Sequence, residues 1–365
     1  MSVPTQMKSM RTQADHKVGV ETVDVPKPQA NEVLVRVKAV TLNPTDWKSA
    51  RMLAAPGNGV GCDAYGEVVS VGSDLAVPLK VGQHVAYFEM GSFNSPRTGT
   101  FSEYSLTQSD NAIIVPEGYD PYEAASWGIG GLTAVQTLFD KLAIKNIDNK
   151  ISSLPSVSAD SPQLLVWAAS TSVGQFAVQL GRVAGYHVIA TASEKNWDYL
   201  KSLGAADLYD YKDDKTPAAI HEKYPKLGLA LDCFSEKGST VAVAKSLGED
   251  APKGSKVCCI LPADKAAKQI RPDVEFITSL VYTTLGREFK FGGWPVSKEE
   301  LAADKKFIKP WVAGQDSIAH NLMAKKLVRG NKIKKMDGGI DAIEKGMDFQ
   351  QSGQVSMEKL AYDIA

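Results

Sequence analysis

The sequence predicts an α/β fold with two parts, a β-rich region followed by a doubly wound parallel sheet. Short β-type segments separated by Gly and Pro occupy the first part of the 365-residue chain. After about residue 145, short apolar runs alternate with segments of helical periodicity, which is typical of a parallel sheet covered by helices. At about 150 residues per domain, the length also fits two domains.

The β-rich region has its clearest strand at NEVLVRVKAV (31–40), where valines at every second position give one mostly apolar face. Gly or Pro recurs every dozen residues or so, which indicates an antiparallel, barrel-like arrangement. Further short strands are expected at Glu67–Val71, His84–Phe88 and Phe101–Leu106.

The α/β region follows residues 143–163, a polar stretch rich in Ser and Pro that we expect to form an exposed loop. Apolar runs predict strands at 164–169, 187–192, 208–211, 229–234 and 256–261. Helical periodicity predicts helices at 173–180, 196–203, 216–224 and 240–247. Beyond them, residues 304–335 give mixed signals and one expected helix, Ile318–Arg329.

The charge balance and hydropathy exclude several classes of protein. Lys plus Arg number 41 and Asp plus Glu number 42, so there is no basic field to attract nucleic acid. No run approaches the roughly 18 apolar residues of a membrane span, and the N-terminus has no apolar signal segment. We therefore expect a soluble cytoplasmic protein with neither nucleic acid nor membrane as a partner.

The spacing of potential metal ligands gives no support for a metal site. The five His are scattered, and the four Cys form neither a ligand pattern nor a disulfide framework. Cys258 and Cys259 fall in a predicted buried strand, where neighbouring side chains point to opposite faces. We expect them to be core residues and the protein to hold no metal.

The turn after the first strand of the α/β region, WAASTSVGQFA, is the strongest local feature. Such a turn aims backbone N–H groups and a helix N-terminus at a pyrophosphate, and close approach requires small residues. Only Gly174 is glycine here, but the hydroxyls of Ser170, Thr171 and Ser172 can donate to phosphate oxygens. This predicts a dinucleotide site; the alternative is a plain small-residue turn that binds nothing.

The residues after the second strand bear on which dinucleotide binds. Ser193 can donate to a ribose 2′-phosphate, and Lys195 adds positive charge, which favours NADP. Glu194 is equally suited to accept from a free 2′-hydroxyl. Lys195 also fits the simpler interpretation of a solvated side chain near a helix start.

Two further groups of polar residues admit both a functional and a structural interpretation. Asp46 and Lys48 follow the first strand, where catalytic domains often place site residues, or they are solvated charges after an Asn-Pro turn. A C-terminal basic cluster suits an acidic carrier protein or is simply a solvated helix end. The basic cluster consists of Lys325, Lys326, Arg329, Lys332, Lys334 and Lys335.

Several segments together resemble the medium-chain dehydrogenase/reductase family: NPTDWK (43–48), GCDAYGEVVSVG (61–72), VGQHV (81–85), GTFSEY (99–104) and AASTSVG (168–174). Zinc-dependent members carry Cys where Asn43 stands and His in the segment of Cys62 and Asp63, and they have a four-cysteine lobe that is missing here. The chain therefore resembles the zinc-independent quinone oxidoreductase and enoyl reductase branch. Within it, the chain is most similar to fungal trans-acting enoyl reductases of the lovastatin type.

The resemblance implies a Rossmann NADPH-binding domain at 141–300. It also implies a GroES-like catalytic domain formed by 1–140 and completed by 301–365. Lys48 is the implied catalytic residue, and the implied substrate residues are Gly128, Gly131, Leu132 and Thr133, with Ser356–Leu360 nearby. The implied NADPH contacts are Thr45, Asp46, Lys48, Ser170, Thr171, Ser172, Val173, Ser193, Lys195, Asn196, Tyr211 and Leu261.

The resemblance also implies hydride transfer from NADPH to the activated C=C of an α,β-unsaturated carbonyl or enoyl thioester, in trans to a polyketide synthase or its acyl carrier protein. One alternative is an NADPH-dependent aldehyde or quinone reductase. A second is a non-catalytic interaction protein with a degenerate reductase fold, since Ala168 and Thr171 replace two turn glycines. No proton donor stands out, and both a monomer and a homodimer agree with the sequence.

Overall fold

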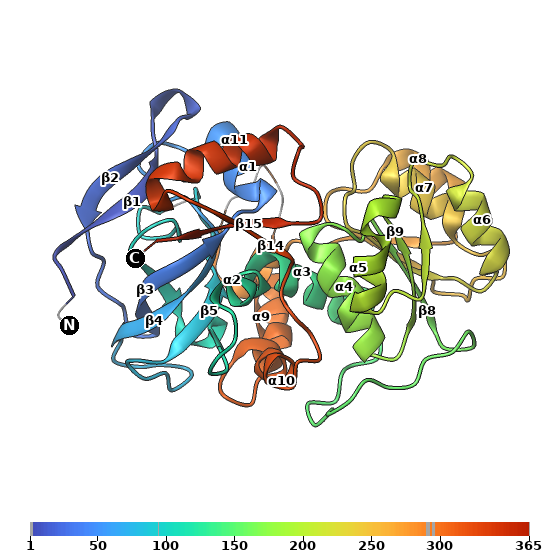
Figure 1. Ribbon diagram of the computed structural model, residues 1–365, viewed down its shortest axis with the longest axis horizontal. Helices are drawn as coiled ribbons and strands as arrows, with labels where there is room; N and C mark the ends of the chain where they lie inside the picture. Colours follow the sequence, from blue (N-terminus) through green and yellow to red (C-terminus); the bar gives the residue numbers. More distant parts are fainter. Residues whose placement is uncertain (1–2, 94, 290–292, 294–295, 365) are drawn as a thin grey trace. The chain divides into compact units, whose positions relative to one another are not determined.

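The computed structural model describes residues 3–93, 95–289, 293 and 296–364, and it divides the chain into two compact units. The discontinuous unit comprises Met1–Ile129 and Tyr282–Ala365, and the central unit comprises Gly130–Val281. Each unit has its own sheet (Figure 1). No described helix is long and apolar enough to cross a membrane.

The central unit is built on a six-stranded, all-parallel sheet of order β10-β9-β8-β11-β12-β13. The order reverses at β8, so the chain winds outward in both directions from this strand, as in a Rossmann-like fold. The carboxyl ends of all six strands therefore lie along one edge. The strands are β8 (Gln163–Trp167), β9 (His187–Thr191), β10 (Asp207–Tyr209), β11 (Leu229–Asp232), β12 (Lys256–Cys259) and β13 (Glu275–Thr278).

Helices cover both faces of this sheet: α4 and α5 lie on one face and α6, α7 and α8 on the other (Figure 1). Their inward residues form an apolar core with the strands, and Cys258 and Cys259 are buried core residues as expected. The helical segments are α3 (Leu132–Val135), η4 (Gln136–Lys141), α4 (Ser172–Val183), η5 (Glu194–Asn196), α5 (Trp197–Leu203), α6 (Thr216–Lys223), α7 (Ser239–Ser246) and α8 (Lys265–Ile270).

The discontinuous unit contains a mixed sheet of order β14-β15-β3-β4-β5-β7, with β6 also paired to β3. The C-terminal strand β15 pairs antiparallel with β3, so the two separate chain segments of this unit share one sheet, while β1 and β2 form a two-stranded sheet of their own. The strands are β1 (Gln6–Thr12), β2 (Val18–Asp24), β3 (Glu32–Thr41), β4 (Asp63–Val71), β5 (His84–Phe88), β6 (Tyr104–Gln108), β7 (Ile113–Ile114), β14 (Ile333–Met336) and β15 (Lys359–Asp363).

The helices of the discontinuous unit come from both ends of the chain, and α1 packs beside α11 (Figure 1). Apolar residues from β3, β4, α11 and β15 share one core cluster. The helical segments are η1 (Ala14–His16), α1 (Pro44–Met52), η2 (Ser109–Asn111), α2 (Pro121–Ala125), α9 (Lys298–Val312), α10 (Ile318–Ala324), η7 (Gly339–Ala342) and α11 (Ile343–Gln351). At the limits of the two units lie η3 (Trp127–Gly131) and η6 (Val281–Leu285).

One helix expected near the C-terminus was wrong in extent, and another helix there was not expected. The helix expected at Ile318–Arg329 ends at Ala324, because Lys326 adopts a left-handed conformation (φ 55°) and its N–H bonds back to the Met323 carbonyl. The mixed signals at residues 304–335 gave no prediction of α9. This helix contains Pro310, and the Ser297 side chain caps its N-terminus.

The β8–α4 turn has no space for a side chain at Gly174. A Cβ built there would lie 2.6 Å from the Ala169 Cα and 2.7 Å from its carbonyl oxygen. The Thr171 hydroxyl caps α4 by accepting from the Gly174 N–H at 3.1 Å, and Ala168 takes a left-handed φ of 59°. The turn is therefore held tightly over the end of β8.

We predict that Gly174→Ala destabilises the protein by about 1–3 kcal/mol, because the added methyl group forces the backbone of the turn apart. The measurement is the urea midpoint of unfolding, compared with Lys201→Ala on the exposed face of α5, which should change stability by less than about 0.5 kcal/mol. Equal midpoints for the two variants would show that the turn can accommodate the added methyl group.

Candidate active site

A buried carboxylate, Asp63, organises the polar residues at the end of β3 in the discontinuous unit. Its Oδ2 accepts from the Thr41 hydroxyl at 2.9 Å and the Asn43 amide at 2.8 Å. The Lys359 ammonium lies 3.2 Å from the same oxygen, and Oδ1 accepts from the Ile129 N–H at 2.6 Å. Both oxygens of this carboxylate are thus hydrogen-bonded and its charge faces an ammonium, as burial of an ion requires.

Sheet register explains how these residues meet. Thr41 and Asp63 are direct partners in the β3–β4 ladder, and Thr41 also pairs with Ala361 of β15. Lys359 begins β15, and its ammonium donates to the Asn43 side-chain oxygen at 2.6 Å. Residues far apart in the sequence therefore converge because three neighbouring strands bring their ends together.

The same residues stand where the resemblance places zinc ligands in other members. Here Asn43 and Asp63 both contact the Lys359 ammonium instead. Among the described residues, no group of three or more His, Cys, Asp or Glu side chains is placed to hold a metal ion.

A second polar group lies next to this carboxylate at the start of α1. Asp46 is buried, and its Oδ2 accepts from the Asn43 N–H at 2.7 Å, as in one half of a capping box. The Tyr282 hydroxyl lies 2.8 Å from the Thr45 hydroxyl and 3.5 Å from the Cys62 sulfur. The Cys62 thiol in turn interacts with the Asp46 carboxyl.

Burial dominates the proton affinities of this group. Desolvation raises the pKa of Asp46 to about 7; the Asn43 N–H opposes this shift and the nearby Asp63 charge adds to it. Burial raises the pKa of the Cys62 thiol well above its usual value, with a further contribution from Asp46, and burial also raises that of Tyr282. Asp46 is therefore the member of the group that changes protonation near neutral pH.

Lys48 lies on α1 one helical turn from Thr45 and is half-buried. Its ammonium lies 5.7 Å from the centroid of the neighbouring Trp47 ring. Helix α1 thus fixes the relative positions of Thr45, Asp46 and Lys48, and of these three residues only Asp46 is fully buried.

The dinucleotide residues expected in the central unit lie where the fold brings strand ends together. All of them follow the carboxyl ends of parallel strands, along one edge of the sheet. After β8 come Ser170, Thr171, Ser172 and Val173; after β9 come Ser193, Lys195 and Asn196; after β10 comes Tyr211; and after β12 comes Leu261. This edge is where nucleotides bind in open parallel sheets.

Two polar residues at this edge were not identified from the sequence. The Thr191 hydroxyl accepts from the Ala168 N–H at 3.0 Å and so ties the end of β9 to the β8–α4 turn. Asp232 at the end of β11 is buried and accepts from the Ser239 and Thr240 hydroxyls at 2.7 and 3.0 Å. An acidic residue ending an apolar strand, LALD, is the signal that points to Asp232.

The expected substrate residues lie on a helical segment that is irregular at Gly128. Gly128 is in a π-helical turn with ψ at −107°, and a Cβ there would lie 2.3 Å from Asp63 Oδ1. Gly131 ends that turn, and Leu132 and Thr133 begin α3; all four residues are buried. Trp127, the first residue of this turn, is fully buried and belongs to the core.

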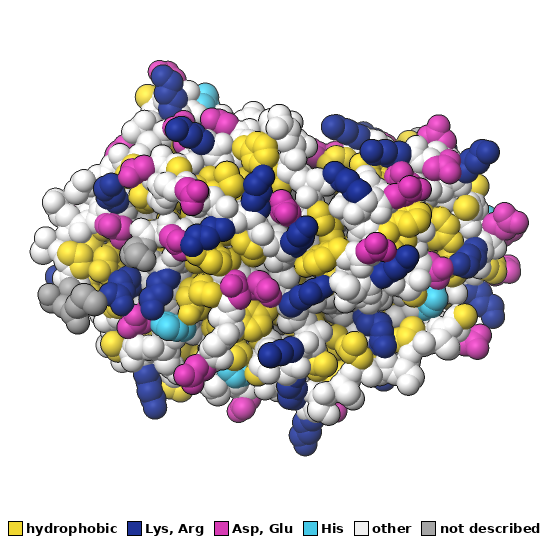
Figure 2. All heavy atoms as spheres, viewed as in Figure 1, with side chains coloured by type: hydrophobic (Ala, Val, Ile, Leu, Met, Phe, Trp, Pro, Cys, Tyr) yellow, Lys and Arg dark blue, Asp and Glu magenta, His cyan; other side chains and the backbone are white. Residues whose placement is uncertain are grey.

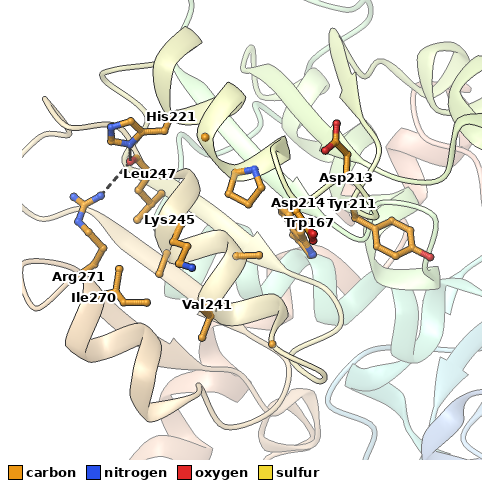
Figure 3. Close-up of a pocket in the computed structure, with 15 residues that line it drawn as sticks. Trp167, Tyr211, Asp213, Asp214, His221, Val241, Lys245, Leu247, Ile270 and Arg271 are labelled. Atoms are coloured by element: carbon orange, nitrogen blue, oxygen red, sulfur yellow. Dashed lines mark hydrogen bonds between the residues drawn. The ribbon is translucent and has the colours of Figure 1, made fainter.

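A separate pocket of about 680 Å³ lies in the central unit (Figure 3). Tyr211 and Asp213 stand at one end, and the His221 ring and the Arg271 guanidinium converge on the Leu247 carbonyl at the other. Tyr211 is exposed and is the one residue that this pocket shares with the expected dinucleotide set.

The basic cluster is exposed, but acidic residues lie among its members. Lys332 pairs with Glu358 at 3.6 Å and Lys335 with Asp363 at 2.7 Å. Lysines and arginines are interspersed with acidic side chains over the face of the molecule shown in Figure 2. The cluster thus adds local charge without a broad basic field.

The fold defines a class, the α/β proteins that combine a Rossmann-like parallel sheet with a second, β-rich unit. Residues 29–117 match the alcohol dehydrogenase GroES-like domain family. The chain is 32% identical to trans-enoyl reductase ACTTS2 of Alternaria alternata, over 98% of each chain. It is 30% identical to trans-enoyl reductase caaB of Aspergillus niger, over 99% of this chain and 98% of that one.

The fold agrees with these matches. The quinone oxidoreductase from Coxiella burnetii superposes with a TM-score of 0.68 at 21% identity, covering 99% of this chain and 100% of that one. The chain belongs to the medium-chain dehydrogenase/reductase superfamily, with trans-enoyl reductases as full-length homologues. The resemblance that the motifs indicated is therefore confirmed.

We predict that Lys359→Met lowers the free energy of unfolding by about 3–5 kcal/mol, because it leaves the Asp63 carboxylate buried without its cation. The matched control is Lys332→Met, which breaks an exposed pair and should cost less than about 1 kcal/mol. Urea unfolding of both variants measures the difference. A Lys359→Met protein as stable as the control would show that Asp63 does not need the ammonium.

Proposed function

We propose that this protein is an NADPH-dependent, zinc-independent reductase that delivers hydride to the activated C=C of an enoyl thioester or another α,β-unsaturated carbonyl, in trans to a polyketide synthase. The observation that carries the proposal is full-length similarity, at about 30% identity, to proteins named trans-enoyl reductases. On this proposal the discontinuous unit is catalytic and the central unit binds the dinucleotide.

The central unit fits a dinucleotide phosphate. Small residues of the β8–α4 turn leave the N-terminus of the 12-residue helix α4 open to a pyrophosphate, and Gly174 allows the turn to stay tight. Ser193 and Lys195 follow β9, where a ribose 2′-phosphate is recognised, and both are at least partly exposed. Exposed Tyr211 stands after the neighbouring strand β10. These donors support NADPH over NADH.

The bound cofactor supplies the hydride, and the residues of the chain orient the reactants and stabilise charge. Lys48 holds the nicotinamide ribose or the carbonyl region of the substrate. Hydride addition to the β-carbon places negative charge on the carbonyl oxygen, and hydrogen-bond donors or a nearby cation lower the energy of this enolate. On this proposal no zinc polarises the carbonyl, and reduction of a conjugated C=C requires less polarisation than alcohol oxidation.

The basic cluster supports an acidic partner. Its exposed members surround the end of α10 and the edge strand β14, so they are accessible to a carrier protein that presents the acyl thioester. Complementary charge steers such an encounter and speeds association. Binding of a carrier protein at this basic surface is part of the proposal that the enzyme acts in trans.

The test of the proposed function follows NADPH consumption with an enoyl thioester, a small enone, an aldehyde and a quinone, each repeated with NADH. Turnover of the enoyl thioester with NADPH is the expected result. Turnover confined to aldehyde or quinone would replace the substrate class and leave the cofactor proposal intact. No NADPH oxidation with any substrate, together with unchanged thermal melting in NADPH, would favour a non-catalytic protein.

We predict that Lys195→Ala weakens NADPH binding by about 10-fold and leaves NADH binding within about 2-fold, because the lost ammonium faces only a 2′-phosphate. Fluorescence titration of each nucleotide gives both dissociation constants. Lys201→Ala, an exposed lysine two turns along the same helical region, is the control and should alter neither. Equal weakening of NADPH and NADH binding would show that Lys195 does not recognise the 2′-phosphate.

A further inference from the structure

A groove in the central unit runs along helix α7, on the face of the sheet that α6, α7 and α8 cover (Figure 3). Its cavity of about 680 Å³ is within the size range of pockets that bind small organic molecules. The lining extends along α7 from Gly238 to Leu247, a length of about 13 Å at 1.5 Å per helical residue. The cavity is therefore elongated and suits a chain-like molecule better than a compact one.

Most of this groove lies away from the edge of the sheet where the dinucleotide is expected. Gly238 precedes the first turn of α7, whereas Leu247 follows its last turn. The residues near Leu247 come from the last turn of α6, which contains His221, and from Arg271 directly after α8. Of the expected dinucleotide residues, only Tyr211 lines the cavity, and it lies at the other end (Figure 3). The end of the groove near Leu247 is thus distinct from the expected dinucleotide site.

Small and apolar side chains form the floor and one rim of the groove. Val241 and Ala242 on α7 are half-buried, and Leu247 below them is buried. Ala218 on α6 is too small to fill the space, and Ile270 at the end of α8 remains 41% exposed. Burial of this apolar surface by an alkyl chain is favourable, because it removes both from water.

An unpaired cation lies among these apolar residues. Lys245 is exposed and lines the cavity one helical turn after Val241. Within the part of the chain that the structure describes, its ammonium makes no hydrogen bond or ion pair. The Arg271 guanidinium, by contrast, is already held by the Asp273 carboxylate at 2.7 Å and the Leu247 carbonyl at 3.2 Å. Lys245 is therefore available to pair with the anionic group of a ligand.

Negative charge at the opposite end of the groove gives a bound anion one orientation. Asp213 and Asp214 line the cavity beside Tyr211, away from the Arg271 end (Figure 3). These carboxylates repel an anion, whereas the Lys245 ammonium attracts it. An elongated ligand with one anionic end thus places that end at Lys245 and leaves its apolar part over the floor of the groove.

We propose that this groove is a second binding site, separate from the dinucleotide site, for a medium-chain carboxylate. The carboxylate pairs with the Lys245 ammonium, and the alkyl chain covers the apolar floor formed by α7. This site goes beyond the proposed reductase function and does not rest on it. The pairing also sets an order of affinities for chains of one length: the carboxylate binds best, the neutral alcohol binds less well, and the alkylammonium binds worst.

The test of the charge uses calorimetric titration of the full-length protein with decanoate, decanol and decylammonium. We expect decanoate to bind at one site about 5-fold more tightly than decanol, the gain of an exposed charge pair, and decylammonium to bind more weakly than either. Lys245→Gln should remove the preference for decanoate over decanol. The control Lys201→Gln, on α5 at the opposite face of the sheet, should retain it. Equal wild-type affinity for decanoate and decanol would overturn the proposal.

The test of the location fills the groove with a side chain. Ala218→Trp places an indole in the cavity and should weaken decanoate binding by more than about 10-fold, because ring and alkyl chain compete for one space. The matched control is Ala219→Trp, the next residue of α6, which is also exposed but does not line the cavity. Decanoate affinity should change by less than about 2-fold in saturating NADPH. Unchanged binding in Ala218→Trp, or displacement of decanoate by NADPH, would overturn a separate site in this groove.

Discussion

The buried Asp63 carboxylate is the constraint on which the architecture of the candidate active site depends. An ionised carboxylate in the interior requires charge and hydrogen bonds around it, and Thr41, Asn43 and Lys359 supply them from the ends of β3 and β15 and the start of α1. Because Lys359 lies six residues from the C-terminus, the C-terminal strand must be in place before this centre is complete. The discontinuous course of the unit is thus tied directly to its chemistry.

The same constraint shapes the protonation of the neighbouring group. The negative charge of Asp63 is one reason that Asp46 stays neutral to about pH 7, and the Asn43 backbone that orients Asp46 belongs to the residue whose side chain binds Asp63. The Asp63 centre therefore holds the start of α1 through Asn43, while burial, with a smaller contribution from Asp63, raises the pKa of the carboxyl on the first turn of that helix. The Lys359 ammonium supplies the cation that this buried carboxylate requires.

Local sequence signals located five of the six strands and four helices of the central unit, but β1, β2, β15 and α11 of the discontinuous unit were not expected. Strands and helices of the central unit follow from periodicity, and one edge collects Ser170, Ser193 and Tyr211 because parallel strands end together. The short edge strand β13 and helix α9 were missed, since a four-residue strand and a helix containing Pro310 give weak local signals. Tyr282 was missed for a different reason, because nothing in its neighbours along the chain indicates that its hydroxyl meets Cys62 and Thr45.

The sequence by itself determined the α/β class, the alternation that builds a parallel sheet and the family to which the motifs belong, because these depend on periodicity and on short segments of contiguous residues. Only the tertiary structure decided which polar residues share a site. Lys359 and Asn43 lie more than 300 positions apart, and their contact follows from the pairing of β15 with β3. Burial decided the rest: desolvation, which a residue acquires only when the fold closes around it, turned Asp46 from an ordinary helix cap into a carboxyl that titrates near neutrality.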